Sequence, residues 1–164
     1  MMKNLKLIAC LLVFLAVLMA IYTRPLLPNL LALQLSFTET DFNSTLHHWP
    51  PENITRFKLH FLLDFPYLIC YGALGFLITT RTKFFNYFSH STKTVIALLL
   101  PLAAVADAME NVMQLYFLYG EKPFSASNYL LAGIISSTKW LLIISFVLIS
   151  LPYRKMIPSS WKSC

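Results

Sequence analysis

The chain has 164 residues, of which 57% are hydrophobic and only 12% are charged, and its formal net charge is +6. An ordinary soluble domain carries about 25% charged residues, so this composition excludes a disordered chain and argues against a water-soluble globule. The basic residues lie at the ends of apolar segments, a placement typical of membrane topology and not of a nucleic-acid-binding surface. The sequence therefore predicts an integral membrane protein whose partner is the lipid bilayer and which binds no nucleic acid.

Four apolar segments are long enough to cross a hydrocarbon core of about 30 Å, which takes roughly 20 helical residues. They cover residues 5–22, 59–80, 94–118 and 128–151, and residues 23–58 form one long loop between the first two. Each segment is expected to be helical, because lipid offers no partner for free backbone groups. The prediction for residues 1–164 is a single all-α membrane domain, a bundle of four transmembrane helices.

The first segment also resembles a signal peptide, with a short basic start followed by an apolar run. Leu18 stands where cleavage after Ala20 would need a small residue, so we expect the segment to be retained as a helix.

Two local signals are present in the 23–58 connection. Thr38 followed by Asp41 is typical of a helix N-cap, and it predicts a short helix reaching His48. Pro50 and Pro51 end that helix, and Pro51 suits the first turn of a helix that continues into the second apolar segment.

The lysines and arginines predict the orientation of the four helices. One side of the membrane receives Lys3, Lys6, Arg81, Lys83, Lys93, Arg154, Lys155 and Lys162. The opposite side receives Arg24, Arg56, Lys58 and Lys122, together with the acidic residues outside the apolar segments, which are Glu39, Asp41, Glu52 and Glu121. The positive-inside rule therefore predicts that both termini are cytoplasmic and that the 23–58 loop is external.

Polar residues inside the apolar segments are the most informative feature, because each ionisable group costs roughly 2.5–3.5 kcal/mol to insert. At helical spacing they form one stripe on each of the last three segments. The stripes are His60, Asp64, Tyr67, Tyr71 and Gly75; Asp107, Glu110, Asn111 and Gln114; and Asn128, Ala132, Ser136 and Lys139. The simplest packing turns all three stripes inward.

The expected depths of the ionisable residues in the membrane indicate that they form a single cluster. At a rise of 1.5 Å per residue, Asp107 and Lys139 lie within about 2 Å of the midplane, with Glu110 and Asp64 about 6 and 8 Å from it. Lys139 can neutralise one carboxylate, most simply Asp107, so a further carboxylate such as Glu110 is expected to be protonated, cation-bound or open to water. The candidate ligand- or ion-binding residues are Asp64, Asp107, Glu110, Asn111, Lys139, Gln114, Tyr71 and His60.

Several short motifs occur in series along the chain. They are Asp64-Phe65-Pro66-Tyr67, Tyr71-Gly72, Pro101, Ala106-Asp107-Ala108-Met109-Glu110-Asn111 and Thr138-Lys139-Trp140. In these the chain resembles an uncharacterised family of small bacterial four-helix integral membrane proteins. The resemblance implies a bacterial inner-membrane location and a common site for the ionisable residues, and it implies no activity.

Motifs for cofactor chemistry are missing from the sequence. It contains no dinucleotide-binding glycine motif, no phosphate-binding loop, no zinc-protease helix and no nucleophile elbow. Its cysteines have no spacing typical of a zinc site, so no cofactor or metal is expected.

Three classes of function remain open. The polar cluster can bind or translocate a cation, a proton or a small amine-bearing solute, and translocation by so few helices suggests a homo-oligomer. It can instead be a structural clamp between helices, or the acid–base centre of a membrane-embedded enzyme with Glu110 and Asp64 as its proton-transfer groups. A closed contact favours the clamp, a pocket open to water favours binding, and a pocket open to lipid favours an enzyme.

Overall fold

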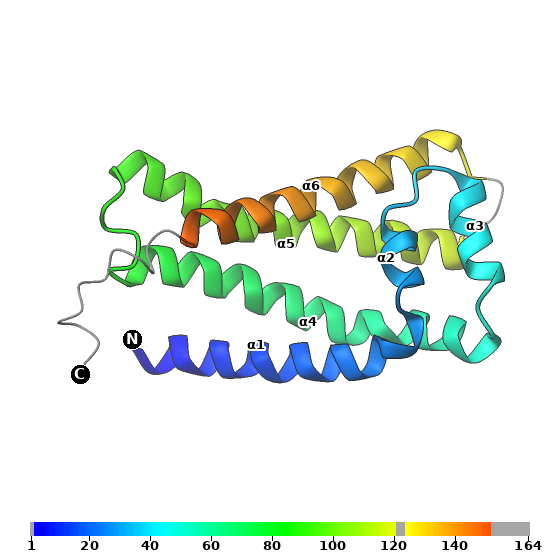
Figure 1. The fold of residues 1–164 in the computed structure, drawn as a ribbon, viewed down its shortest axis with the longest axis horizontal. Helices are drawn as coiled ribbons and strands as arrows, with labels where there is room; N and C mark the ends of the chain where they lie inside the picture. Colours follow the sequence, from blue (N-terminus) through cyan, green and yellow to red (C-terminus); the bar gives the residue numbers. More distant parts are fainter. Residues whose placement is uncertain (1, 121–123, 152–164) are drawn as a thin grey trace.

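A computed structural model describes residues 2–120 and 124–151, and all regular structure within them is helical (Figure 1). In chain order the elements are α1 (Met2–Thr23), the short 3-10 helix η1 (Arg24–Leu26), α2 (Asn29–Gln34), α3 (Glu39–His47), α4 (Pro51–Arg81), α5 (His90–Tyr119) and α6 (Ala126–Ser150). Helices α1, α4, α5 and α6 are long and apolar enough to cross a membrane. The prediction of an all-helical chain with four long apolar helices is therefore confirmed.

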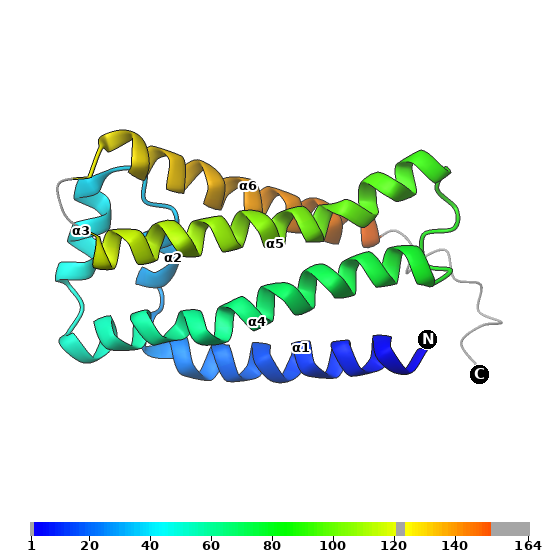
Figure 2. The ribbon, with the colours of Figure 1, turned by 180° about the vertical axis from the view of Figure 1, so that it is seen from behind.

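The long helices pack in chain order. Helix α4 packs against α1 and α5, and α5 packs against α6. Figures 1 and 2 show α1 on the outside of this row next to α4, with α6 crossing in front of α5 in the first view and behind it in the second. Helix α1 begins and α6 ends at the end of the bundle where α4 turns into α5, opposite the end that carries α3.

The connection over residues 23–58 is more helical than expected, because it contains η1 and α2 in addition to the predicted α3. Helix α4 begins at Pro51, so the apolar segment expected from residue 59 is the continuation of a longer helix. The first two turns of α4 carry Glu52, Arg56 and Lys58, so they extend the helix without adding to its apolar span. Pro51 occupies the first turn, as predicted, because its missing N–H would have no partner there.

Helix α3 begins as its capping pattern predicts. The side chain of Thr38 accepts a hydrogen bond from the backbone N–H of Asp41 at 3.1 Å, and its hydroxyl donates to the Asp41 carboxylate at 2.7 Å. The helix ends at His47, next to the expected boundary at His48.

A hydrophobic core fills the end of the bundle that carries α2 and α3. Its buried members are Leu26, Leu30, Leu33, Phe42, Trp49, Phe57, Phe61, Phe117, Phe124, Tyr129 and Ala132. Because these residues come from every element between η1 and α6, the short helices are packed onto the long ones. The segment from η1 to Phe37, which we call the strap, is held in this way.

Single contacts fix the strap and α1. An added Cβ at Gly133 of α6 would lie 2.5 Å from the Phe37 ring, so glycine is what lets this ring approach α6 closely. Arg56 of α4 donates a hydrogen bond to the carbonyl of Tyr22 at 3.1 Å and thereby satisfies a free carbonyl in the last turn of α1.

Some of the charged residues used to predict orientation lie outside the described part of the chain. They are Glu121, Lys122, Arg154, Lys155 and Lys162.

Candidate functional site

The three polar stripes face the interior of the bundle, as predicted. Glu110 and Ser136 are 0% exposed, and Lys139 is 3% exposed. The other buried stripe members are His60, Tyr71, Gly75, Asp107, Asn111, Gln114 and Ala132. Helical periodicity therefore identified the inward faces of α4, α5 and α6 correctly.

Lys139 bridges two carboxylates and not one. Its Nζ lies 3.0 Å from Oδ1 of Asp107 and 2.6 Å from Oε2 of Glu110. Gln114 donates to Oε1 of Glu110 at 2.8 Å, and Tyr71 donates its hydroxyl to Oδ2 of Asp107 at 3.1 Å. The expectation that Lys139 serves Asp107 alone is thus corrected, because the two carboxylates lie one turn apart on α5 and a lysine opposite can reach both.

Asp64 stands apart from this contact. One oxygen of its carboxylate accepts a hydrogen bond from the amide of Asn111 at 2.6 Å. Among the described residues no lysine, arginine or histidine forms an ion pair with Asp64. Lys139 therefore pairs with two of the three carboxylates, and Asp64 is the one left without a cationic partner among the described residues.

A pocket of about 370 Å³ adjoins these groups. Its polar wall is made by Gln34, Asp64, Tyr67, Tyr71, Asp107 and Lys139. Its apolar wall is made by Leu100, Trp140, Ile143, Phe146 and Val147. The pocket is thus lined by residues of α4, α5 and α6, together with Gln34 at the end of α2.

The apolar wall of the pocket reaches the surface of the bundle. Val147 is 49% exposed, and it lies in a helix long and apolar enough to cross a membrane. Helices α4 and α6 each pack on α5 and make little contact with each other. The pocket is therefore bounded on this side by partly exposed apolar side chains of α6.

Not every predicted site residue lines the pocket. Asp64, Tyr71, Asp107 and Lys139 do, whereas Glu110, Gln114, Asn111 and His60 do not. Glu110 is fully buried and does not line the pocket. His60 is buried among aromatic rings, with its ring stacked on Phe57 and its Nδ1 next to the Phe57 carbonyl oxygen.

The sequence analysis missed the apolar wall of the pocket and two further lining residues, Gln34 and Trp140. Gln34 reaches it from the strap, and its Oε1 is buried without a hydrogen-bond partner among the described residues. Its position one turn after Leu30, a core residue, was the available signal. Trp140 directly follows Lys139, and its ring lies 5.4 Å from the lysine Nζ.

The carboxylates are not arranged as a metal site. Within residues 2–120 and 124–151, no three His, Cys, Asp or Glu side chains converge closely enough to hold a metal ion. The carboxylates instead contact Lys139, the Tyr71 hydroxyl and the side-chain amides of Asn111 and Gln114.

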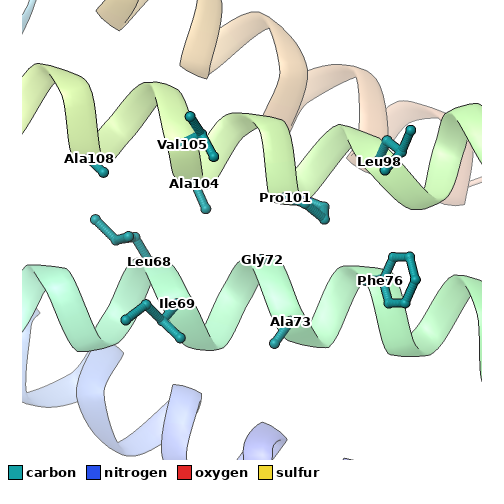
Figure 3. A pocket seen from close by; sticks show the side chains of 10 residues that line it. All are labelled: Leu68, Ile69, Gly72, Ala73, Phe76, Leu98, Pro101, Ala104, Val105 and Ala108. Atoms are coloured by element: carbon teal, nitrogen blue, oxygen red, sulfur yellow. The ribbon is translucent and has the colours of Figure 1, made fainter.

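A second groove, between α4 and α5, has a different character (Figure 3). Figure 3 shows the side chains that line it, from Leu68 to Phe76 on α4 and from Leu98 to Ala108 on α5, and all of them are apolar. Gly72 and Ala104 meet across it, since an added Cβ at Gly72 would lie 3.0 Å from the Ala104 Cβ. This groove offers packing for apolar chains and no polar contact.

Comparison of the chain with models of known protein families, with curated proteins and with solved structures finds no match.

Proposed function

We propose that this protein is a membrane-embedded binding protein for a small cationic solute that carries an amine, with Asp64 as the counter-ion. The observation that carries this proposal is that Asp64 lines a pocket of about 370 Å³ without a cationic partner, while Lys139 is engaged by Asp107 and Glu110. A carboxylate in low dielectric is strongly destabilised unless it is paired or neutralised. A bound ammonium group supplies that pairing.

Electrostatics and pocket chemistry support a cation over an anion. When all groups are ionised, Asp64, Asp107 and Glu110 carry three negative charges against the single positive charge of Lys139. Tyr67, Tyr71 and Trp140 add aromatic rings to the pocket walls, and aromatic faces attract ammonium groups.

The contact among Asp107, Glu110 and Lys139 has a structural role in this proposal. It joins α5 to α6 next to the pocket and holds two pocket-lining side chains in place. The clamp and the binding site are thus two parts of one polar cluster, with Glu110 belonging to the clamp.

The proposed location is the cell membrane, with the bacterial inner membrane as its specific form. Both termini are proposed to be cytoplasmic, on the charge distribution given above. The strap and α3 then lie on the external side.

The test is binding of butylammonium to the purified protein in detergent micelles, measured as a saturable rise in the midpoint of thermal unfolding. Wild type and Glu52→Gln, which removes an exposed carboxylate, are expected to respond equally. Asp64→Asn is expected to lose the response, while its amide oxygen can still accept the Asn111 hydrogen bond and preserve the fold. An equal response of Asp64→Asn, or an equal response of the wild type to butanol, contradicts the proposal.

Acid–base catalysis on an apolar substrate is a second candidate. The position of the apolar wall at the lipid-facing side favours it, because such a substrate can enter from the bilayer. Asp64 would then be the proton-transfer group in place of Glu110. Covalent conversion of a bound amphiphile by wild type and not by Asp64→Asn is the outcome that favours catalysis over binding.

A further inference from the structure

The pocket has two chemically different halves, and this division restricts the ligand class. The polar half brings together Asp64 and Gln34, and the apolar half extends along α6 from Trp140 to Val147. Between Lys139 and Val147 the helix rises by about 12 Å, at 1.5 Å per residue. A small hydrophilic cation can fill only the first half.

The polar half offers hydrogen-bond acceptors. Oε1 of Gln34 is buried and has no partner among the described residues. The Asp64 oxygen that does not bond to Asn111 accepts no hydrogen bond from a described residue either. Because an unpaired buried acceptor costs about 1–3 kcal/mol, the Gln34 oxygen favours a ligand that donates a hydrogen bond as well as carrying a positive charge. The free oxygen of the half-buried Asp64 offers a second acceptor in the same pocket.

The apolar half is built for a hydrocarbon group. Leu100, Ile143, Phe146 and Val147 present no polar side-chain atom, and Val147 reaches the lipid-facing surface. Helices α4 and α6 make little contact with each other. A hydrocarbon tail lying in this half therefore reaches the surface of the bundle, where we expect it to meet the acyl chains of the lipids. The strap crosses the other end of the pocket, so the opening between α4 and α6 is the route left for an apolar tail.

We infer that the ligand is an amphipathic primary or secondary amine: its ammonium group donates hydrogen bonds to Asp64 and Gln34, and its hydrocarbon tail lies along Trp140 to Val147 and enters from the bilayer. This inference rests on the proposed function, since it assigns the class of solute that the same pocket takes. A quaternary ammonium ion satisfies the charge but not the acceptors. A short amine satisfies the acceptors but leaves the apolar half unfilled.

The tail position is tested by fluorescence quenching of Trp140. A variant with Trp49→Phe and Trp161→Phe retains this tryptophan alone, and it is placed in bilayer vesicles with ω-bromoundecylamine, whose bromine quenches indole at short range. We expect saturable quenching that Asp64→Asn abolishes and Glu52→Gln retains. The matched alcohol, ω-bromoundecanol, is expected to give only the non-saturating quenching of a compound dissolved in lipid. If the double variant does not fold, the difference between wild type and Trp140→Phe gives the same signal.

The acceptor requirement is tested with ω-bromoundecyltrimethylammonium, which has the same charge and tail but no N–H. We expect its half-saturating concentration to be at least about tenfold higher, the loss that charged hydrogen bonds predict. Gln34→Leu is expected to weaken binding of the primary amine at least about tenfold, the equivalent of one hydrogen bond to a charged group.

The outcomes separate this inference from the proposed function. Equal affinity for the primary and quaternary compounds overturns the acceptor requirement. Absence of saturable Trp140 quenching, in a protein that binds butylammonium through Asp64, overturns the tail position and leaves the proposed function standing. Absence of binding by both amines overturns both.

Discussion

Removal of the Lys139 charge is the perturbation whose cost the structure predicts most directly. Lys139→Met leaves Asp107 and Glu110 one turn apart on α5, both buried, with no cation between them. Breaking a buried ion pair by removing one partner costs about 3–5 kcal/mol. Proton uptake by the stranded carboxylates limits this cost but itself requires free energy at neutral pH.

Removing the two carboxylate charges one at a time shows which of them causes the loss of stability in Lys139→Met. Adding Asp107→Asn to Lys139→Met removes one stranded carboxylate but leaves Glu110 unpaired, so we expect only part of the stability to return. Adding Glu110→Gln as well removes the last charge while its side-chain amide can still bond to Gln114. The triple variant is expected to lie within about 1–2 kcal/mol of wild type, since buried ion pairs contribute little net stability against neutral replacements.

The assay is equilibrium unfolding of the purified variants in mixed micelles, with far-ultraviolet circular dichroism as the readout. Lys93→Met is the matched control, because Lys93 makes only an exposed contact, with Asn86, and its loss is expected to cost under about 1 kcal/mol. The reasoning is refuted if Lys139→Met costs no more than Lys93→Met, or if the triple variant is less stable than Lys139→Met alone.

Three further predictions follow from the same geometry. Glu110→Gln should change butylammonium affinity less than about twofold, because Glu110 does not line the pocket; loss of binding would place Glu110 in the site. Gly133→Ala should lower stability by about 1–3 kcal/mol, the usual cost of overpacking, and weaken amine binding by displacing Phe37 and the strap; unchanged melting and binding would contradict this. Reporter fusions after Lys93 should read cytoplasmic and fusions after Gly120 external, and the reverse pattern would overturn the proposed orientation.

Helical periodicity in the sequence predicted much of the fold and half of the site residues. Stripes spaced at three and four residues identified the buried faces of α4, α5 and α6, because an ionisable group at membrane depth has few other places to lie. The N-cap at Thr38 and the proline at Pro51 marked helix starts through backbone chemistry that needs no tertiary information.

Periodicity did not give the depth of each side chain within the cluster. Asp107 and Glu110 share a face of α5 and both contact Lys139, yet of the two only Asp107 lines the pocket. Gln34 was missed for a related reason. Gln34 reaches the pocket only because the strap folds back onto the bundle. This packing depends on aromatic contacts from distant parts of the chain and on the small size of Gly133.

Carbodiimide coupling tests most directly whether a bound amine lies against Asp64. Dicyclohexylcarbodiimide enters the bilayer and converts a carboxyl group to an O-acylisourea, from which an adjacent amine displaces dicyclohexylurea to form an amide. Mass spectrometry of the digested protein locates the adduct. With undecylamine we expect an adduct on Asp64 whose yield saturates with amine concentration, and we expect no adduct at this position in Asp64→Asn. Adducts confined to exposed carboxylates such as Glu39 and Glu52, with Asp64 unmodified, would contradict the proposed binding site.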